Sequence, residues 1–63
     1  MRYPIKQFVK MLETNGISVR RNSNHLIVRD SETGRVYTVG LNYIERLGPE
    51  TAHRNTIRRL TAA

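Results

Sequence analysis

The sequence predicts an α+β fold in the order αβββα, in which a three-stranded antiparallel sheet carries two helices on one face. Three observations support this prediction: apolar residues recur at helical spacing near the start, alternate with polar residues in the middle, and return to helical spacing near the end. Both helices are expected on the same face because such a sheet has one apolar face to cover. With 63 residues, the chain has room for a single hydrophobic core, so residues 1–63 are expected to form one domain.

The first helix is expected over residues 4–14. Pro4 suits its first turn, where the missing N–H would have no intrahelical partner. Asn15-Gly16 suits its end, where a left-handed residue commonly follows the last turn. Apolar side chains at spacings of three, four and seven share one face of this helix. They are Ile5, Phe8, Val9 and Leu12.

Three strands are expected over residues 17–22, 25–29 and 35–39. The polar turns Asn22-Ser23-Asn24 and Asp30 to Gly34 separate them. Because both connections are short, an antiparallel meander is the simplest pairing. Alternation divides the first strand between two faces, with Ile17, Val19 and Arg21 on one face and Ser18, Arg20 and Asn22 on the other.

The helical pattern is weaker after residue 40. Asn42 with Glu45 three positions later predicts a short helical turn, which ends at Gly48-Pro49. Thr51 or Asn55 is expected to cap a final helix. The inward-facing residues of that helix are expected to be Ile57 and Leu60, and the water-facing residues Arg54, Arg58 and Arg59.

Charge and composition exclude several functional classes. The net charge is +6, and nine of the eleven basic residues are arginine, whose planar fork of donors matches phosphate and favours a polyanionic partner. The absence of cysteine excludes disulfides, thiolate catalysis and cysteine zinc sites. With only two histidines and no glycine-rich phosphate loop, we expect neither a metal nor a cofactor. No apolar run is long enough for a signal peptide or a membrane span, so we expect no membrane partner and a cytoplasmic location.

His25 is the candidate for proton transfer, since histidine exchanges protons readily near neutral pH. It opens the second strand within five residues of Arg20, Arg21 and Arg29. This grouping favours a general acid or base beside guanidinium groups that hold a phosphate. The alternative is an exposed histidine at a strand edge. His53 is expected in a polar segment before the last helix.

The arginines form two groups along the chain, one on the predicted sheet and one on or before the last helix. If folding brings the groups to one side, they make an electrostatic footprint for a nucleic-acid backbone. An evenly cationic, solvated surface is the alternative. The tyrosines either stack on unpaired bases or form half-buried core. The candidate RNA-binding residues are Arg20, Arg21, Arg29, Arg35, Arg58 and Arg59, and the tyrosines are Tyr3, Tyr37 and Tyr43.

An ordered set of segments between Ile5 and Leu60 resembles a known family. The segments are the helix end Leu12 to Gly16, the strand Ile17 to Arg21, the turn and strand Ser23 to Arg29, the strand Gly34 to Val39, and the stretch Asn55 to Leu60. Together they are similar to the HicA-type toxins, which are messenger-RNA endonucleases of the type II HicA/HicB toxin–antitoxin systems of bacteria and phages.

The resemblance implies a fold like the double-stranded RNA-binding domain, ribosome-independent cleavage of messenger RNA, growth arrest, and neutralisation by a HicB-type antitoxin that covers the active histidine. In the family a Gly-Ser step precedes this histidine. His25 takes the matching position here, after Ser23-Asn24. On this hypothesis His25 performs one of the proton transfers of RNA cleavage, and Arg20, Arg21 or Arg29 holds the phosphate.

Two other functional classes remain open from the sequence. The first is a non-catalytic small regulator, in one version encoded by a phage, that binds RNA or a host protein and uses His25 only for contact. The second is a DNA-binding module, although the expected helices lack helix-turn-helix spacing.

Overall fold

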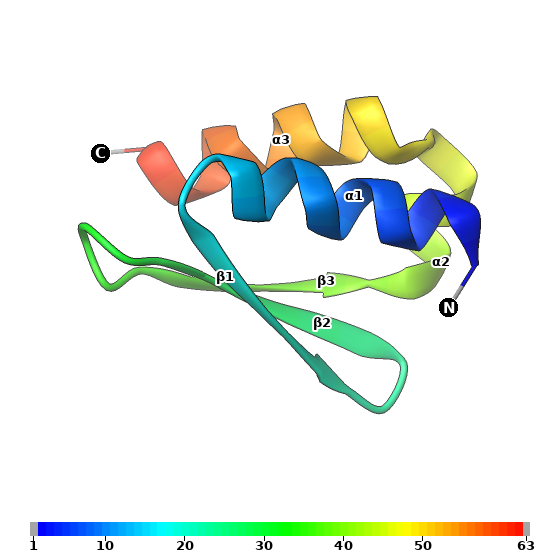
Figure 1. The fold of residues 1–63 in the computed structure, drawn as a ribbon, viewed down its shortest axis with the longest axis horizontal. Coiled ribbons are helices and arrows are strands. Elements are labelled where there is room, and N and C mark those ends of the chain that lie inside the picture. The colour runs from blue at the N-terminus through cyan, green and yellow to red at the C-terminus, as the bar shows by residue number, and fades with distance from the viewer. Residues whose placement is uncertain (1, 63) are drawn as a thin grey trace.

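A three-stranded antiparallel sheet forms one layer of the molecule and helices form the other (Figure 1). The computed structural model describes residues 2–62. Its elements are α1 (Tyr3–Thr14), β1 (Ile17–Asn22), β2 (His25–Asp30), β3 (Val36–Gly40), α2 (Leu41–Leu47) and α3 (Pro49–Thr61). The predicted α+β class and antiparallel sheet are confirmed. The short helical turn expected after residue 42 is a two-turn helix, α2, so the order within the described residues is αβββαα.

The strands follow one another in the order β1-β2-β3, so β2 is the central strand. Asn22 pairs with His25, which leaves Ser23-Asn24 as a two-residue hairpin loop. Residues that face each other across an antiparallel pair lie on the same side of the sheet. Leu26 and Val28 are buried beneath the helices, so the residues that alternate with them lie on the other side.

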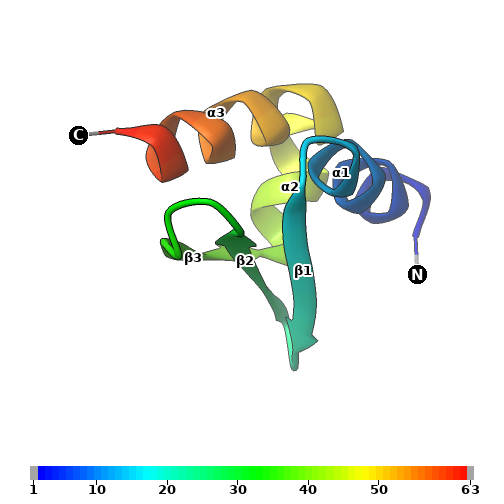
Figure 2. The same cartoon turned by 60° about the vertical axis from the view of Figure 1, so that its left-hand side comes forward.

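That other side is not covered by any helix of residues 2–62 (Figure 2), and we call it the open face. The paired rows that make up the open face are Ser18, Arg29 and Val36; Arg20, Ile27 and Thr38; and Asn22, His25 and Gly40. The alternation predicted for the first strand is confirmed, because Ile17 is buried and Val19 half-buried on the helix side.

The hydrophobic core lies between the sheet and the helices. Helix α1 contacts β1, whereas α3 contacts β3, and α1 and α3 also contact each other. Phe8 is fully buried at the centre of this layer. The predicted inward positions of the first helix and of Leu60 are confirmed, and Ile57 is half-buried. The buried apolar residues are Ile5, Phe8, Leu12, Ile17, Leu26, Val28, Val39, Ile44, Ala52 and Leu60.

The predicted start of the final helix was wrong. Helix α3 begins at Pro49, directly after Gly48, and neither Thr51 nor Asn55 caps it. Proline is well suited to a first helical turn, and Gly48 adopts the left-handed φ of 88° that joins α2 to α3. The early turns carry a weak sequence signal because their buried positions, Ala52 and Thr56, are small or polar residues.

Smaller differences concern element ends. The first helix begins one residue earlier than expected, β2 and β3 each end one residue later, and Arg35 precedes β3 in the turn. Asn42 does not cap α2, whose N-cap is Gly40.

None of the helices between residues 2 and 62 combines the length and the apolar composition that crossing a membrane requires.

Candidate functional site

His25 is exposed on the open face, at the first position of the central strand. Its backbone is held on both sides. The carbonyl of the preceding residue, Asn24, accepts a hydrogen bond of 3.1 Å from the N–H of Leu41, where β3 passes into α2. Across the hairpin, Asn22 pairs with His25. The imidazole therefore projects from a fixed piece of backbone into solvent.

The hairpin before His25 requires an unusual backbone conformation. Ser23 has a φ of 58°, the one positive value among the non-glycine residues that the structure describes. A positive φ at the first loop position is typical of a tight hairpin turn that glycine prefers. The side chain of Arg21 supports this loop, because its Nε donates a hydrogen bond of 3.2 Å to the carbonyl of Ser23. Arg21 thus helps to set the turn that aims the imidazole.

The residues around His25 on the open face include Asn22, Gly40 and Arg20. Asn22 lies directly opposite His25 on β1, and Gly40 lies opposite it on β3. A Cβ atom at Gly40 would be 3.8 Å from the Cδ2 of His25, so the ring lies against bare backbone. Arg20 pairs with Ile27 and is therefore the diagonal neighbour of His25, at about 7–8 Å between backbones.

The structure separates the three arginines that sequence proximity had grouped around His25. Arg20 lies beside His25 on the open face. Arg29 shares that face but is four residues along β2, which corresponds to about 13 Å. Arg21 pairs with the buried Leu26 and so lies on the helix side, where it lines a cavity together with Arg2 and Glu45. Only Arg20 is close enough to share one phosphate with the imidazole without a long reach.

The remaining candidate arginines lie elsewhere. Arg35 is exposed in the turn between β2 and β3, where its carbonyl accepts a hydrogen bond of 2.9 Å from the N–H of Asp30. Arg58 and Arg59 are exposed on α3, and the guanidinium of Arg59 lies 5.9 Å from the centre of the Tyr37 ring. Folding therefore divides the candidate arginines between the open face, the turn before β3 and the helix side of the molecule.

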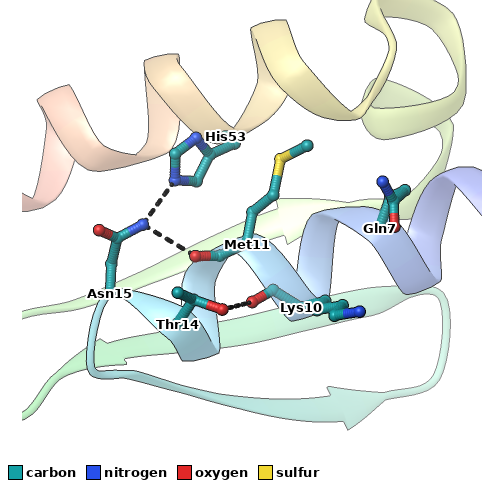
Figure 3. A pocket seen from close by; sticks show the side chains of 6 residues that line it. All are labelled: Gln7, Lys10, Met11, Thr14, Asn15 and His53. Atoms are coloured by element: carbon teal, nitrogen blue, oxygen red, sulfur yellow. Dashed lines mark hydrogen bonds between the residues drawn. The ribbon is translucent and has the colours of Figure 1, made fainter.

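His53 lies inside α3, not in a polar segment before it. Its Nε2 atom is 3.1 Å from Nδ2 of Asn15, and the same amide group donates a hydrogen bond of 2.8 Å to the carbonyl of Met11 (Figure 3). Because Nδ2 is a donor, Nε2 of His53 is the acceptor in this contact. Figure 3 shows the ring between α1 and α3, on the helix side, where it lines a groove of about 340 Å³ with Lys10. His53 links two helices and is remote from His25.

The chemistry of the open face is that of a cationic surface with a single proton-transfer group. None of the residues on its paired rows is a carboxylate, and His25 is the one histidine among them. Across residues 2–62, three or more potential metal-ligating side chains do not gather at any point. What the face offers is therefore an imidazole, two guanidinium groups and the polar side chains of Ser18, Asn22 and Thr38.

Asn22 is a site residue that the sequence analysis placed at the end of the first strand and in the following turn, without a functional role. A two-residue hairpin brings the residues on either side of the loop directly opposite each other. Counting a loop of that length in the sequence would have placed the amide of Asn22 beside His25. Thr38 could be found only from the pairing of β2 with β3, which depends on the longer turn.

Comparisons of the chain with profiles of known protein families, with curated proteins and with solved structures find no match. The resemblance to HicA-type toxins therefore stays a prediction. The residues and their geometry are the basis on which a function is assigned.

Proposed function

We propose that this protein is an endoribonuclease of the HicA toxin type, which cleaves messenger RNA with His25 as the group that transfers a proton. The observation that carries the proposal is the exposed imidazole on a cationic, helix-free sheet face, with Arg20 as its diagonal neighbour. RNA supplies its own nucleophile, so a cleaving protein needs a group that moves a proton and a cation that stabilises the phosphate. The open face provides both.

The proposed reaction is an internal transfer at phosphorus. The ribose 2′-oxygen loses its proton and attacks the adjacent phosphorus, the bond to the 5′-oxygen of the next nucleotide breaks, and that oxygen takes up a proton. The products are a 2′,3′-cyclic phosphate and a 5′-hydroxyl end. His25 carries out one of the two proton transfers, while Arg20 stabilises the negative charge that grows on the phosphate oxygens. A lone histidine supplies about 10² to 10⁴ in rate, which makes a slow enzyme.

The decisive experiment is incubation of purified protein with end-labelled single-stranded RNA. We expect fragments with cyclic phosphate ends from the wild-type chain and none from His25→Ala. His53→Ala is the matched control, since it removes the other histidine from a different side of the molecule and should leave cleavage intact. An RNA with 2′-deoxyribose at the scissile position should resist cleavage.

Undiminished cleavage by His25→Ala, with circular dichroism showing a folded chain, would remove the assignment. RNA binding that falls with salt but yields no fragments would instead favour the non-catalytic regulator. That alternative draws on one observation: the open face has no second acid or base beside His25.

The proposed substrate implies action in the cytoplasm, and the resemblance implies a HicB-type antitoxin as the partner. An antitoxin that covers His25 would bind the open face, which the helices of residues 2–62 leave uncovered. Expression of the chain alone should arrest growth, and His25→Ala should relieve the arrest. Co-expression with the product of an adjacent antitoxin gene should also relieve it, and should block cleavage by the purified complex.

A further inference from the structure

A polar groove of about 420 Å³ opens on the helix side of the molecule, beside the edge strand β3. Tyr37 of β3 forms one wall, Tyr43 of α2 a second, and α3 the third. Tyr37 pairs with the buried Val28, so its ring is on the opposite side of the sheet from His25. The groove is thus separate from the open face, with the edge of β3 between them. We call it the Tyr37 groove; its lining residues are Tyr37, Tyr43, Asn55, Arg58 and Arg59.

Two arginines give the Tyr37 groove a positive charge that no lining carboxylate offsets. Arg58 and Arg59 both line it, and no carboxylate does. Within residues 2–62 one ion pair forms, between Arg2 and Glu45, so neither arginine of the groove is paired with a carboxylate there. Because both arginines line the same groove, an anion bound there gains attraction from both.

The ring of Tyr37, with the guanidinium of Arg59 over it, forms a flat surface in the groove. The guanidinium of Arg59 is 5.9 Å from the centre of the Tyr37 ring, within the range of a cation–π contact. Tyr37 is itself half-buried against the core, so its ring is held in place. Aromatic rings and guanidinium planes are the surfaces on which proteins stack unpaired bases.

The third component is a pair of fixed hydrogen-bonding groups. Nδ2 of Asn55 donates a hydrogen bond of 3.0 Å to the hydroxyl oxygen of Tyr43. The hydroxyl therefore keeps its own proton as a donor, and Asn55 keeps its carbonyl oxygen and its second N–H. A donor and an acceptor at fixed positions can read the edge of a base that lies against the Tyr37 ring.

We propose that the Tyr37 groove binds one nucleotide of the single-stranded RNA substrate, with its phosphate held by Arg58 and Arg59 and its base against the surface that Arg59 and Tyr37 form together. This inference rests on the proposed function and extends it to a second contact with the same RNA strand. Because β3 is an edge strand, no other strand blocks the way from His25 to the groove. Gly40 beside His25 and Tyr37 are three residues apart, or about 10 Å. The strand must be unpaired, since a base whose face and edge both contact the protein has left the stack and the pairing of a duplex.

The test measures binding and cleavage separately. In a His25→Ala background, the Kd of a short fluorescent single-stranded RNA is measured at several salt concentrations. The double variant Arg58→Gln/Arg59→Gln should weaken binding at least about tenfold and lower the salt slope by about 0.7, because the protein no longer neutralises one phosphate of the single strand. The matched control, Lys6→Gln/Lys10→Gln, removes the same charge from α1 and should change Kd by no more than about twofold, because screening weakens distant charges.

A second measurement distinguishes a nucleotide from a simple anion. Adenosine 5′-monophosphate, inorganic phosphate and adenosine are titrated separately into isotope-labelled protein. The monophosphate should shift both the Asn55 side-chain amide and the Arg59 Nε signal, whereas inorganic phosphate should shift only the arginine. A monophosphate that leaves the Asn55 amide unmoved would overturn base recognition in the groove.

The outcomes separate the two proposals. Equal losses of binding in the arginine and lysine variants would overturn the Tyr37 groove while leaving cleavage at His25 untouched. Binding that depends on the groove arginines, in a protein whose wild-type form yields no fragments, would support the groove and overturn the nuclease. A wild-type chain that neither binds nor cleaves RNA would overturn both.

Discussion

When the arginines of the open face are replaced one at a time, the loss of cleavage rate should depend on how close each arginine lies to His25 in the strand register. Arg20 is the diagonal neighbour of His25, whereas Arg29 is about 13 Å away along the same strand as the histidine. Loss of a cation in direct contact with developing charge typically costs about 10² to 10³ in rate, so we expect Arg20→Gln to lower kcat by about 10²-fold. At about 13 Å through water, one unit charge changes a rate by less than about twofold, and this is the effect expected for Arg29→Gln.

The assay is single-turnover cleavage of a labelled RNA at saturating protein, which separates the chemical step from binding. Lys6→Gln serves as the control because it removes one charge from the exposed side of α1. Circular dichroism should show that all variants are folded, since both sheet arginines lie on the open face, outside the core. A loss in Arg29→Gln as large as that in Arg20→Gln would refute the positional reasoning, and so would an unchanged rate in Arg20→Gln.

Three further predictions concern stability. Thr56 is buried and its hydroxyl lacks a hydrogen-bond partner within residues 2–62, so Thr56→Val should raise Tm by about 4–8 °C, for a gain of about 1 kcal/mol. The control Thr61→Val changes a surface hydroxyl that bonds the Ile57 carbonyl, and it should have little effect on Tm. A lower Tm for Thr56→Val would contradict the explanation. Ser23→Gly should be at least as stable as wild type in urea titration, because relief of about 1–2 kcal/mol of left-handed strain outweighs the added chain entropy. Ser23→Val should be less stable than wild type, and equal midpoints for the glycine and valine variants would argue against the strained turn. Phe8→Ala should lose about 3–5 kcal/mol, enough to unfold most of a chain this small at 25 °C by circular dichroism, and a cooperative transition near the wild-type Tm would show that Phe8 is not central to the core.

The sheet and the first helix could be predicted because their signals are local. Two short polar turns between alternating segments specify a meander, and the side chains of Ile5, Phe8 and Leu12 mark the buried face of α1. The start of α3 could not be predicted in this way. Its buried positions Ala52 and Thr56 do not differ enough from their neighbours in hydropathy to reveal the helical period.

The candidate site was partly visible in the sequence. His25 stands out as a histidine at the start of a strand, and alternation already assigned Arg20 and Arg21 to different faces. The choice between Arg20 and Arg29 needs the register, which depends on hairpin geometry. The meeting of Arg59 with Tyr37 could not be foreseen, because it depends on how α3 packs over β3, and that packing is set by contacts between residues distant in the chain.

The one-sided covering of the sheet has an evolutionary consequence. The buried side chains that stabilise the fold lie between the sheet and the helices, and side chains such as Arg20, His25 and Thr38 project the other way and are exposed. Changes at the exposed positions cost little folding energy, so selection can remodel what the protein recognises while the scaffold persists. A saturation library should therefore tolerate most replacements there when scored for abundance, and far fewer when scored for toxicity.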